Sequence, residues 1–318
     1  MLGDFIAGTV PVCNYILAHY QDVQFYFFMD EYNASIVKYF FPDNSIIVKI
    51  RKGNPYFNLI KLAIKYRSLN FDVGISPVPC RPRLNNLFLF ILNCSQRFGP
   101  TNKKLISKLT LNHKYIDNPS IHVGLSSLRM VVGNSISLSN KLYPLMRQDI
   151  IKPYKLGPET SQAKLKILVE VSNNRASSQL DLAKIAIILN TLLTSYRFVV
   201  LISAKINDAD KAYQLSMLLN TTSEIGMTTN FDDFISYVHM ANIALVGDGG
   251  LAHILGALNK KVVALYGKTS VDRWSILSDA NTTRHLYDSI NINNISNEDI
   301  INELKIVLNE EITISTQR

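Results

Sequence analysis

The sequence predicts an α/β protein made of two domains, each with a parallel sheet flanked by helices. At 318 residues the chain is long for one domain and sufficient for two that each bury a core. Residues 241–269 add a direct signal, because the apolar runs Ile243–Val246 and Val262–Tyr266 flank Leu251–Leu258, which has helical spacing. A strand, a helix and a second strand in this order form the unit from which parallel sheets are built.

Other segments repeat the alternation of strand and helix. Gln24–Met29, Ser45–Ile50, Phe71–Ser76, Leu165–Val171 and Phe198–Ser203 are predicted strands, and Tyr56–Leu69, Ser120–Ile136, Leu180–Leu193, Phe231–Met240 and Asn297–Asn309 are predicted helices. The polar stretch Lys152–Ala163 contains Pro153, Gly157 and Pro158 and is interpreted as the linker. We therefore expect domains at residues 1–150 and 151–318.

Composition excludes several classes of protein. The hydrophobic fraction is 47% and the charged fraction 18%, and no apolar run approaches the roughly 20 residues of a membrane span. No secretory signal is visible at the N-terminus. The three cysteines, Cys13, Cys80 and Cys94, are odd in number and widely spaced, which argues against a disulfide framework and a paired-cysteine metal site. A reducing cytoplasm is the expected compartment.

The turn after Ile243–Val246 is a candidate phosphate site. Gly249 and Gly250 stand where the strand passes into the helix, and glycines there let an anion approach the N–H groups of a helix N-terminus. Asp248 at the end of the strand can accept hydrogen bonds from sugar hydroxyls, and His253, one turn into the helix, is expected to face the same crevice. The alternative is an ordinary glycine turn with a histidine facing the core.

These residues resemble the signature of the heptosyltransferase-type glycosyltransferases, glycosyltransferase family 9. The resemblance lies in Asp248-Gly249-Gly250-Leu251-Ala252-His253, then Gly256-Ala257-Leu258, then Val263-Ala264-Leu265-Tyr266-Gly267-Lys268-Thr269. It implies the GT-B fold, in which two Rossmann-like domains face each other across a cleft, and metal-independent sugar transfer from a nucleotide-sugar such as an ADP-heptose, with no further cofactor. Gly249 replaces the Thr or Ser of the family and so lacks its hydroxyl.

The first residues, 1–11, are similar to the opening of the same family. The resemblance assigns the role of general base to Asp4, which would take a proton from the acceptor hydroxyl. Two features depart from the pattern: Pro11 follows Asp4 by seven residues instead of six, and the strand expected before Gly3 is almost absent. Either the start lies downstream of the true one or the first strand is lost, which would leave the central position of the N-terminal sheet unfilled. Alternatively, Asp4 caps a helix that begins near Phe5.

The loop that follows Leu165–Val171 corresponds to the family's donor-phosphate loop. Ser172 and Ser177 supply hydroxyls there, and Arg175 replaces the family's lysine as the cation that neutralises the leaving diphosphate. The alternative is a simple helix N-cap. Asp208 is predicted to reach the nucleotide ribose, or else to be an ordinary first-turn carboxylate. Asp208-Ala209-Asp210 has the form of a metal motif, but we predict no metal site.

Charge is divided unequally between the two halves. Residues 1–150 contain 17 Lys and Arg against 8 Asp and Glu, a net charge of +9, and residues 151–318 contain 16 against 17, a net charge of −1. This asymmetry favours an anionic acceptor or an acidic membrane surface as a partner of the first half. Arg81 and Arg83, in an irregular loop forced by Pro77, Pro79 and Pro82, are the candidate acceptor residues, or else solvated surface charges. Nucleic acid is not expected, because no binding motif for it is present.

Together these features predict a glycosyltransferase that moves a heptose-like sugar from a nucleoside-diphosphate donor to an anionic cell-envelope glycolipid, such as the inner core of lipopolysaccharide. The expected location is cytoplasmic, peripherally attached to the inner membrane. Two alternatives stay open: a sugar-nucleotide epimerase or hydrolase on the same scaffold, and a non-catalytic protein that only binds saccharide.

Overall fold

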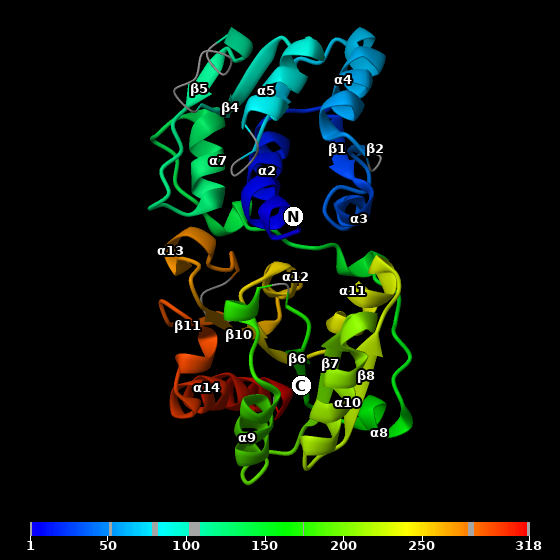
Figure 1. Cartoon of the computed structure of the whole chain (residues 1–318), viewed down its shortest axis with the longest axis vertical. Coiled ribbons are helices and arrows are strands. Elements are labelled where there is room, and N and C mark those ends of the chain that lie inside the picture. Colours follow the sequence, from blue (N-terminus) through cyan, green and yellow to red (C-terminus); the bar gives the residue numbers. More distant parts are fainter. Residues whose placement is uncertain are drawn as a thin grey trace. The chain divides into compact units, whose positions relative to one another are not determined.

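The computed structural model describes residues 2–50, 53–77, 82–101, 109–173, 175–278 and 283–316. The chain forms two compact units, Met1–Pro144 and Leu145–Arg318, each with parallel strands and helices (Figure 1). The division lies six residues before the boundary expected after residue 150. Residues of the segment 145–150 belong to the second unit because Met146 N–H donates to the Ala257 carbonyl at 2.8 Å and Gln148 Nε2 donates to the Leu258 carbonyl at 3.1 Å.

The C-terminal unit contains a six-stranded parallel sheet. Its strands are β6 (Lys166–Glu170), β7 (Val199–Ala204), β8 (Ser223–Met227), β9 (Ile243–Gly247), β10 (Lys261–Tyr266) and β11 (Thr283–Tyr287). Their spatial order is β11-β10-β9-β6-β7-β8, which is the order of a dinucleotide-binding α/β fold. β6 and β9 lie side by side although some 70 residues separate them, and the chain leaves this pair in opposite directions. This point is the topological switch of the sheet.

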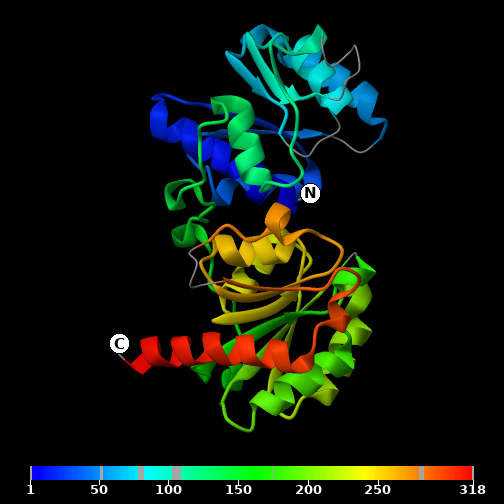
Figure 2. The same ribbon diagram turned by 90° about the vertical axis from the view of Figure 1, so that its left-hand side faces the viewer.

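Both faces of this sheet are covered, so its inner strands are continuous apolar runs. On one face Ile167, Ile202 and Leu245 share a buried cluster with side chains of α9 (Leu182–Leu192), α10 (Ala209–Leu218) and α14 (Asn297–Thr316). α11 (Phe231–His239) and α12 (Gly250–Ala257) contact β8, β9 and β10 and take no part in that cluster. Figure 2 shows α12 and α14 on opposite sides of the strands.

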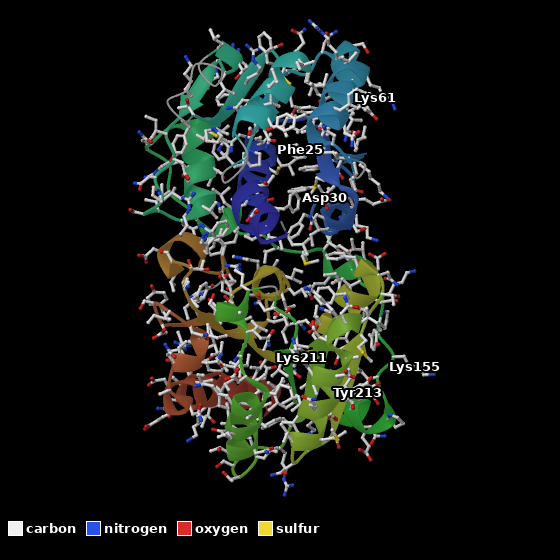
Figure 3. All side chains as sticks on the ribbon, viewed as in Figure 1. Phe25, Asp30, Lys61, Lys155, Lys211 and Tyr213 are labelled. Carbon is white, nitrogen blue, oxygen red and sulfur yellow. The ribbon has the colours of Figure 1, made fainter. Side chains whose placement is uncertain are left out.

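The described residues of the N-terminal unit form five short strands in two separate parallel sheets, β1-β2 and β3-β4-β5. These strands are β1 (Phe25–Asp30), β2 (Ser45–Ile50), β3 (Val73–Ile75), β4 (Gln96–Pro100) and β5 (His113–Tyr115). In the described part of the chain no strand joins β1 to β3, as the near-absent first strand led us to expect. Aromatic side chains link the two sheets instead, because Phe71 beside β3 packs edge-on against Tyr26 of β1 with ring centroids 5.0 Å apart. Figure 3 shows β1 between its labelled ends, Phe25 and Asp30.

The first described residues of this unit are helical. α1 (Leu2–Asp4) continues through a π-helical turn, Phe5–Thr9, into α2 (Val10–His19). Asp4 has helical backbone angles, φ −63° and ψ −38°, and its side chain makes no capping hydrogen bond. The expectation that Asp4 sits in a strand-to-helix turn, and the alternative that it caps a helix beginning near Phe5, are both wrong for the described chain.

Three further sequence predictions need correction. Pro82 begins α5 (Pro82–Ile91), since proline is well tolerated in the first turn of a helix, so Arg83 lies in a helix and not in the irregular loop. The linker predicted at 152–163 contains a short helix, α8 (Pro158–Gln162). The helix predicted at 120–136 is shorter, α7 (Val123–Val132), and ends at Gly133, whose φ of 107° favours glycine.

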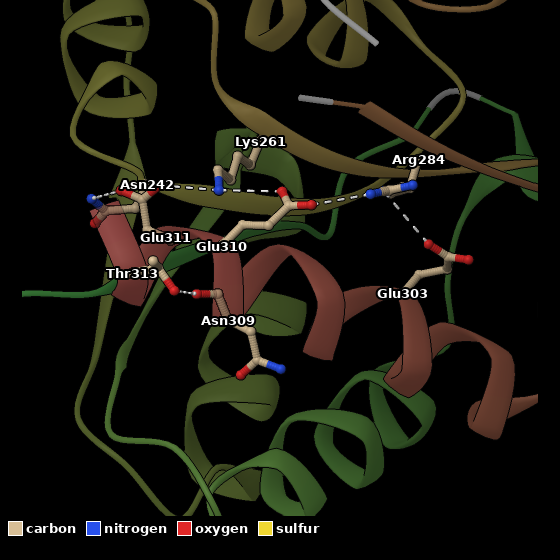
Figure 4. Close-up of polar contacts among 8 residues, drawn as sticks. All are labelled: Asn242, Lys261, Arg284, Glu303, Asn309, Glu310, Glu311 and Thr313. Carbon is tan, nitrogen blue, oxygen red and sulfur yellow. Dashed lines mark hydrogen bonds and ion pairs between the residues drawn. The ribbon is translucent and has the colours of Figure 1, made fainter. Parts of the chain in front are cut away.

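The C-terminal helix α14 runs seven residues beyond its predicted end at Asn309, and an ion-pair network fixes this extension to the sheet (Figure 4). Lys261 of β10, only 10% exposed, lies 3.3 Å from Glu310 and 3.7 Å from Glu311. Arg284 of β11 lies 3.2 Å from the same Glu310. Burial of the Lys261 stem leaves its ammonium group dependent on these carboxylates.

Among the described residues, the α-helices not yet mentioned are α3 (Glu31–Ala34), α4 (Pro55–Tyr66) and α13 (Val271–Trp274). α4 begins after Asn54, whose side chain accepts hydrogen bonds from the N–H groups of Tyr56 and Phe57. None of the helices that the structure describes is both long enough and apolar enough to span a membrane.

Candidate functional site

The carboxyl ends of β6 and β9 bring the predicted donor residues together. In open parallel sheets, ligands bind outside the carboxyl ends of the strands at the topological switch point. The loop after β6 carries Ser172, Arg175 and Ser177, and β9 is followed directly by Asp248 and Gly249. The order of the strands thus places two segments that are distant in sequence at one end of the sheet in the C-terminal unit.

Arg175 is the centre of the polar contacts at this end of the sheet. Its Nη1 donates to Asp248 Oδ2 at 2.9 Å and to Thr269 Oγ1 at 2.7 Å. The Asp248 side chain is only 3% exposed, whereas that of Arg175 is 50% exposed. The buried Asp248 carboxylate therefore binds one side of the Arg175 guanidinium. The exposed N–H groups of the guanidinium are available to an anion such as a diphosphate.

Asn173, which the sequence analysis did not single out, ties the loop to β9. Its side-chain amide donates to the Asp248 carbonyl at 3.0 Å, while its Oδ1 accepts from Arg175 N–H at 3.0 Å. Thr269 was missed as well. It lies at the end of the Gly267-Lys268-Thr269 string, and this position was the available signal for its role.

Two glycines let the donor loop lie directly on the sheet. A Cβ atom on Gly267 would come within 2.5 Å of the Ser177 carbonyl oxygen, and one on Gly247 would collide with the Ser178 carbonyl oxygen. Any other residue at either position would push residues 176–178 away from the strand ends. Ser177 itself is half-buried in this turn, and Ser178 is buried. Close backbone approach is thus the reason for glycine at these two positions.

Gly249 differs from those two glycines. It precedes the first residue of α12 in an extended conformation, φ 174°, which any residue can adopt. The one side-chain atom near a Cβ added at Gly249 is the Asn173 amide nitrogen, at 3.3 Å. The N-cap position has no side-chain hydrogen bond, so the first N–H groups of α12, from Gly250 onward, lack a side-chain acceptor at the N-cap and are available to an anion.

His253 is 4% exposed. Its ring packs edge-on against Trp274, with centroids 6.5 Å apart, which places it between α12 and α13. This position fits the alternative of a core-facing histidine better than a side chain open to the crevice. Its predicted contact with a sugar stays a prediction.

Ser172 and Asp208 meet at the carboxyl ends of β6 and β7. Ser172 Oγ accepts from Lys205 N–H at 2.9 Å and also hydrogen-bonds the Asp208 carboxylate. Asp208 accepts from Lys211 Nζ at 2.7 Å. The Lys211 contact, followed by the Ser172 contact, lowers the pKa of Asp208, so this carboxylate is ionised and able to accept a hydroxyl hydrogen bond.

Glu170, the last residue of β6, adds an ionisable group that the sequence analysis missed. Burial raises the pKa of Glu170 to about 8; the nearby charge of Lys205 lowers it and that of Asp208 raises it. A glutamic acid in this setting is protonated at neutral pH and can donate a hydrogen bond. Its place at the end of an apolar run concealed it among strand residues.

The candidate residues of the N-terminal unit are less completely placed. Asp4 is half-buried at the end of α1. Arg81 lies outside the described residues, and of Arg83 only the backbone, in α5, is described. Their predicted roles toward an acceptor stay predictions.

Two further features of the described residues bear on the chemistry. Among the described residues no group of three or more His, Cys, Asp and Glu side chains is arranged to hold a metal ion. A groove of about 600 Å³ lies between α9 and the end of α10, lined by Ala183, Ala186, Ile187, Asn190, Thr191, Thr194 and Leu218. Because none of these side chains is ionisable, the groove lacks the groups expected of a diphosphate site.

Comparison with known proteins agrees with this geometry. Residues 185–303 match the model of glycosyltransferase family 9 (heptosyltransferase). The C-terminal unit contains a glycosyltransferase family 9 domain. The matched residues span β7 to β11 with α12 between them. No curated protein sequence matches the chain significantly.

Solved structures share the fold of the whole chain. The ADP-heptose lps heptosyltransferase II of E. coli is 15% identical, with a TM-score of 0.75, and the match covers 98% of this chain and 97% of that one. The E. coli heptosyltransferase WaaC with ADP is 12% identical, with a TM-score of 0.73 and coverage of 96% and 97%. A putative UDP-N-acetylglucosamine 2-epimerase from Listeria monocytogenes reaches a TM-score of 0.52 at 10% identity, covering 90% and 88%. The GT-B fold predicted from the sequence is confirmed.

Proposed function

We propose that this glycosyltransferase moves a heptose-like sugar from a nucleoside-diphosphate donor, bound in the C-terminal unit, to an anionic cell-envelope glycolipid bound by the N-terminal unit. The observation that supports donor binding is the pair of hydrogen bonds from Arg175 to Asp248 and Thr269 at the switch point of the sheet. It sets a cation beside the N-terminus of α12, where a diphosphate has both a counter-charge and N–H donors.

In the proposed reaction an acceptor hydroxyl oxygen bonds to the anomeric carbon of the sugar while the bond from that carbon to the diphosphate oxygen breaks. Negative charge then grows on the departing diphosphate, and Arg175 with the N–H groups of Gly249 and Gly250 stabilises it. Asp4 accepts the proton of the acceptor hydroxyl. Asp248 acts largely by positioning Arg175, and Ser172 with Asp208 meets the ribose.

The donor is proposed to be a nucleotide-sugar of the ADP-heptose kind. The family model and the structure of WaaC, which is described with ADP, support this choice. The net charge of +9 in residues 1–150 supports an anionic acceptor such as the inner core of lipopolysaccharide, and attachment to the cytoplasmic surface of a membrane that displays it. No cofactor is needed beyond the donor.

The test is donor binding by an arginine variant. Arg175→Gln removes the cation but keeps some polar capacity, so we expect the dissociation constant for ADP, measured by titration calorimetry, to rise about 10-fold to 100-fold, the scale of a hydrogen bond to a charged group. Arg147→Gln is a matched control, because Arg147 pairs with Asp149 at 2.6 Å on an exposed surface of the same unit. Equal ADP affinity in the wild type and in Arg175→Gln would refute the assigned site.

Turnover distinguishes transfer from the alternatives. A transferase releases nucleoside diphosphate only when acceptor is present, an epimerase changes the sugar without adding a glycosyl group to the acceptor, and a saccharide-binding protein does neither. Mass spectrometry of acceptor and nucleotide after incubation separates the three outcomes.

A further inference from the structure

α4 (Pro55–Tyr66) has two apolar faces, and only one of them is covered. On the covered face Leu59, Leu62, Ala63 and Tyr66 pack against a core built around Phe88 and Leu92. An amphipathic helix on a globular domain ordinarily presents a polar surface opposite such a face. α4 departs from this rule.

The outer face of α4 carries four exposed apolar side chains. Their exposed fractions are 59% for Tyr56, 68% for Phe57, 36% for Ile60 and 63% for Ile64. Tyr56, Ile60 and Ile64 follow one another at intervals of four residues, and Phe57 stands one turn before Ile60 and Lys61, so the four form one stripe along the helix. A contiguous apolar stripe of this kind marks a surface that meets something other than water.

Lysines border this stripe. Lys61 and Lys65 are both exposed, and they lie beside Phe57 and Ile64 on the helix surface. Figure 3 shows the Lys61 side chain pointing outward from the N-terminal unit. From residue 44 to residue 71 the sequence contains six Lys and Arg and no Asp or Glu. The chemistry of this face is therefore aromatic and aliphatic in the middle and cationic at its border.

We propose that the outer face of α4 is a membrane-docking surface that lies in the headgroup region of an anionic lipid bilayer. Tyr56, Phe57, Ile60 and Ile64 enter the boundary of the acyl chains, and Lys61 and Lys65 contact lipid phosphates, which is the pattern of an interfacial helix. A symmetric dimer through this face would place the lysines of both copies close together without acidic partners, so charge complementarity favours the lipid surface. The proposal deepens the proposed function by naming the surface that meets the membrane, and it does not require donor binding.

The experiment is co-sedimentation of the full chain with vesicles of phosphatidylcholine containing phosphatidylglycerol. Phe57→Ser with Ile64→Ser should lower the partition coefficient by roughly 10-fold or more, because two large apolar side chains lose their place in the bilayer. Lys61→Gln with Lys65→Gln should lower binding to these vesicles and leave the weak binding to pure phosphatidylcholine unchanged. Met217→Ser with Ile206→Ser is the matched control, since these side chains are 79% and 66% exposed in the C-terminal unit, and it should bind like the wild type.

Two readouts keep the outcomes separate. ADP affinity should be the same in all these variants, so loss of vesicle binding with normal ADP affinity supports the docking surface whether or not the donor assignment holds. Ile60→Trp should show a blue shift of its fluorescence when vesicles are added. Unchanged vesicle binding in the Phe57 and Ile64 variant would overturn the proposal. A wild type that is dimeric in solution and becomes monomeric in this variant would equally overturn it, because the face would then be a protein interface.

Discussion

Gly249→Ser offers the sharpest test of the donor site, because it adds a hydroxyl where the resemblance to family 9 places one. The backbone φ of 174° is open to any residue. An added Cβ would lie 3.3 Å from the Asn173 amide nitrogen, a tight contact that a shift of the Asn173 side chain by a few tenths of an ångström relieves. The substitution should therefore fold normally.

The expected gain follows from the new hydrogen bond. A hydroxyl that donates to a charged phosphate oxygen is worth about 1.5–3 kcal/mol, and part of this is lost in ordering the side chain, so we expect about 1–2 kcal/mol, or roughly 5-fold to 30-fold tighter ADP binding. Serine at this position can also cap α12, which would raise the free energy of unfolding by a few tenths of a kcal/mol. The two effects are separable, because capping of α12 stabilises the protein without ADP and the phosphate hydrogen bond acts only when ADP is bound.

Two control variants isolate the hydroxyl. Gly249→Ala adds the Cβ alone and should leave ADP affinity close to that of the wild type. Gly267→Ala places a Cβ within 2.5 Å of the Ser177 carbonyl oxygen, so it should displace the donor loop, lower the free energy of unfolding by about 1–3 kcal/mol and weaken ADP binding.

The dissociation constant for ADP, by titration calorimetry, and the melting temperature without ligand are measured for the wild type and the three variants. Tighter binding by Gly249→Ser alone supports a phosphate at the start of α12. If Gly249→Ser raises the melting temperature but leaves ADP affinity unchanged, the added hydroxyl is only a cap and the diphosphate lies elsewhere.

Two further predictions concern ionisable groups. Because burial raises the pKa of Glu170 from 4.5 to about 8, the folded state binds more protons than the unfolded state across this range, and the free energy of unfolding falls as pH rises through it. Glu170→Gln should remove this fall, and because each pKa unit corresponds to about 1.4 kcal/mol, it should exceed the wild type at pH 8 by about 4 kcal/mol in chemical denaturation. Asp4→Asn should lower turnover by about 10²-fold with unchanged ADP affinity if Asp4 is the general base, and normal turnover would exclude that role.

The sequence was most informative about the C-terminal unit. Its strands are buried on both faces, so Ile243–Val246 and Val262–Tyr266 stand out as apolar runs, and β9 and β10 begin and end within one residue of these limits. The donor segments were also found, because strand ends that pass through glycine and hydroxyl residues have a recognisable composition. Local composition is therefore sufficient to locate a strand that is central in its sheet and has only parallel neighbours.

The N-terminal unit was harder for a physical reason. Its strands are short, its two sheets are separate, and the apolar residues of β1 are all only half-buried, so the contrast between core and surface is weak along the chain. The beginning of α5 at Pro82 was hidden because prolines at 77, 79 and 82 together indicate a loop, although the last of them lies in the first helical turn. The first strand expected from the resemblance has no counterpart in the described residues.

The role of Asp248 shows what local patterns could not reveal. At the end of a strand an aspartate is a natural ligand for sugar hydroxyls, but here its carboxylate is 3% exposed and bonded to Arg175, which lies 73 residues earlier. Arg175 also reaches Thr269, 94 residues later. These contacts exist only because β6 and β9 are neighbours at the switch point and β10 follows beside them. The strand order thus brings three polar residues that are distant in sequence into contact, and two of them, Asp248 and Thr269, hold the Arg175 guanidinium in a fixed position.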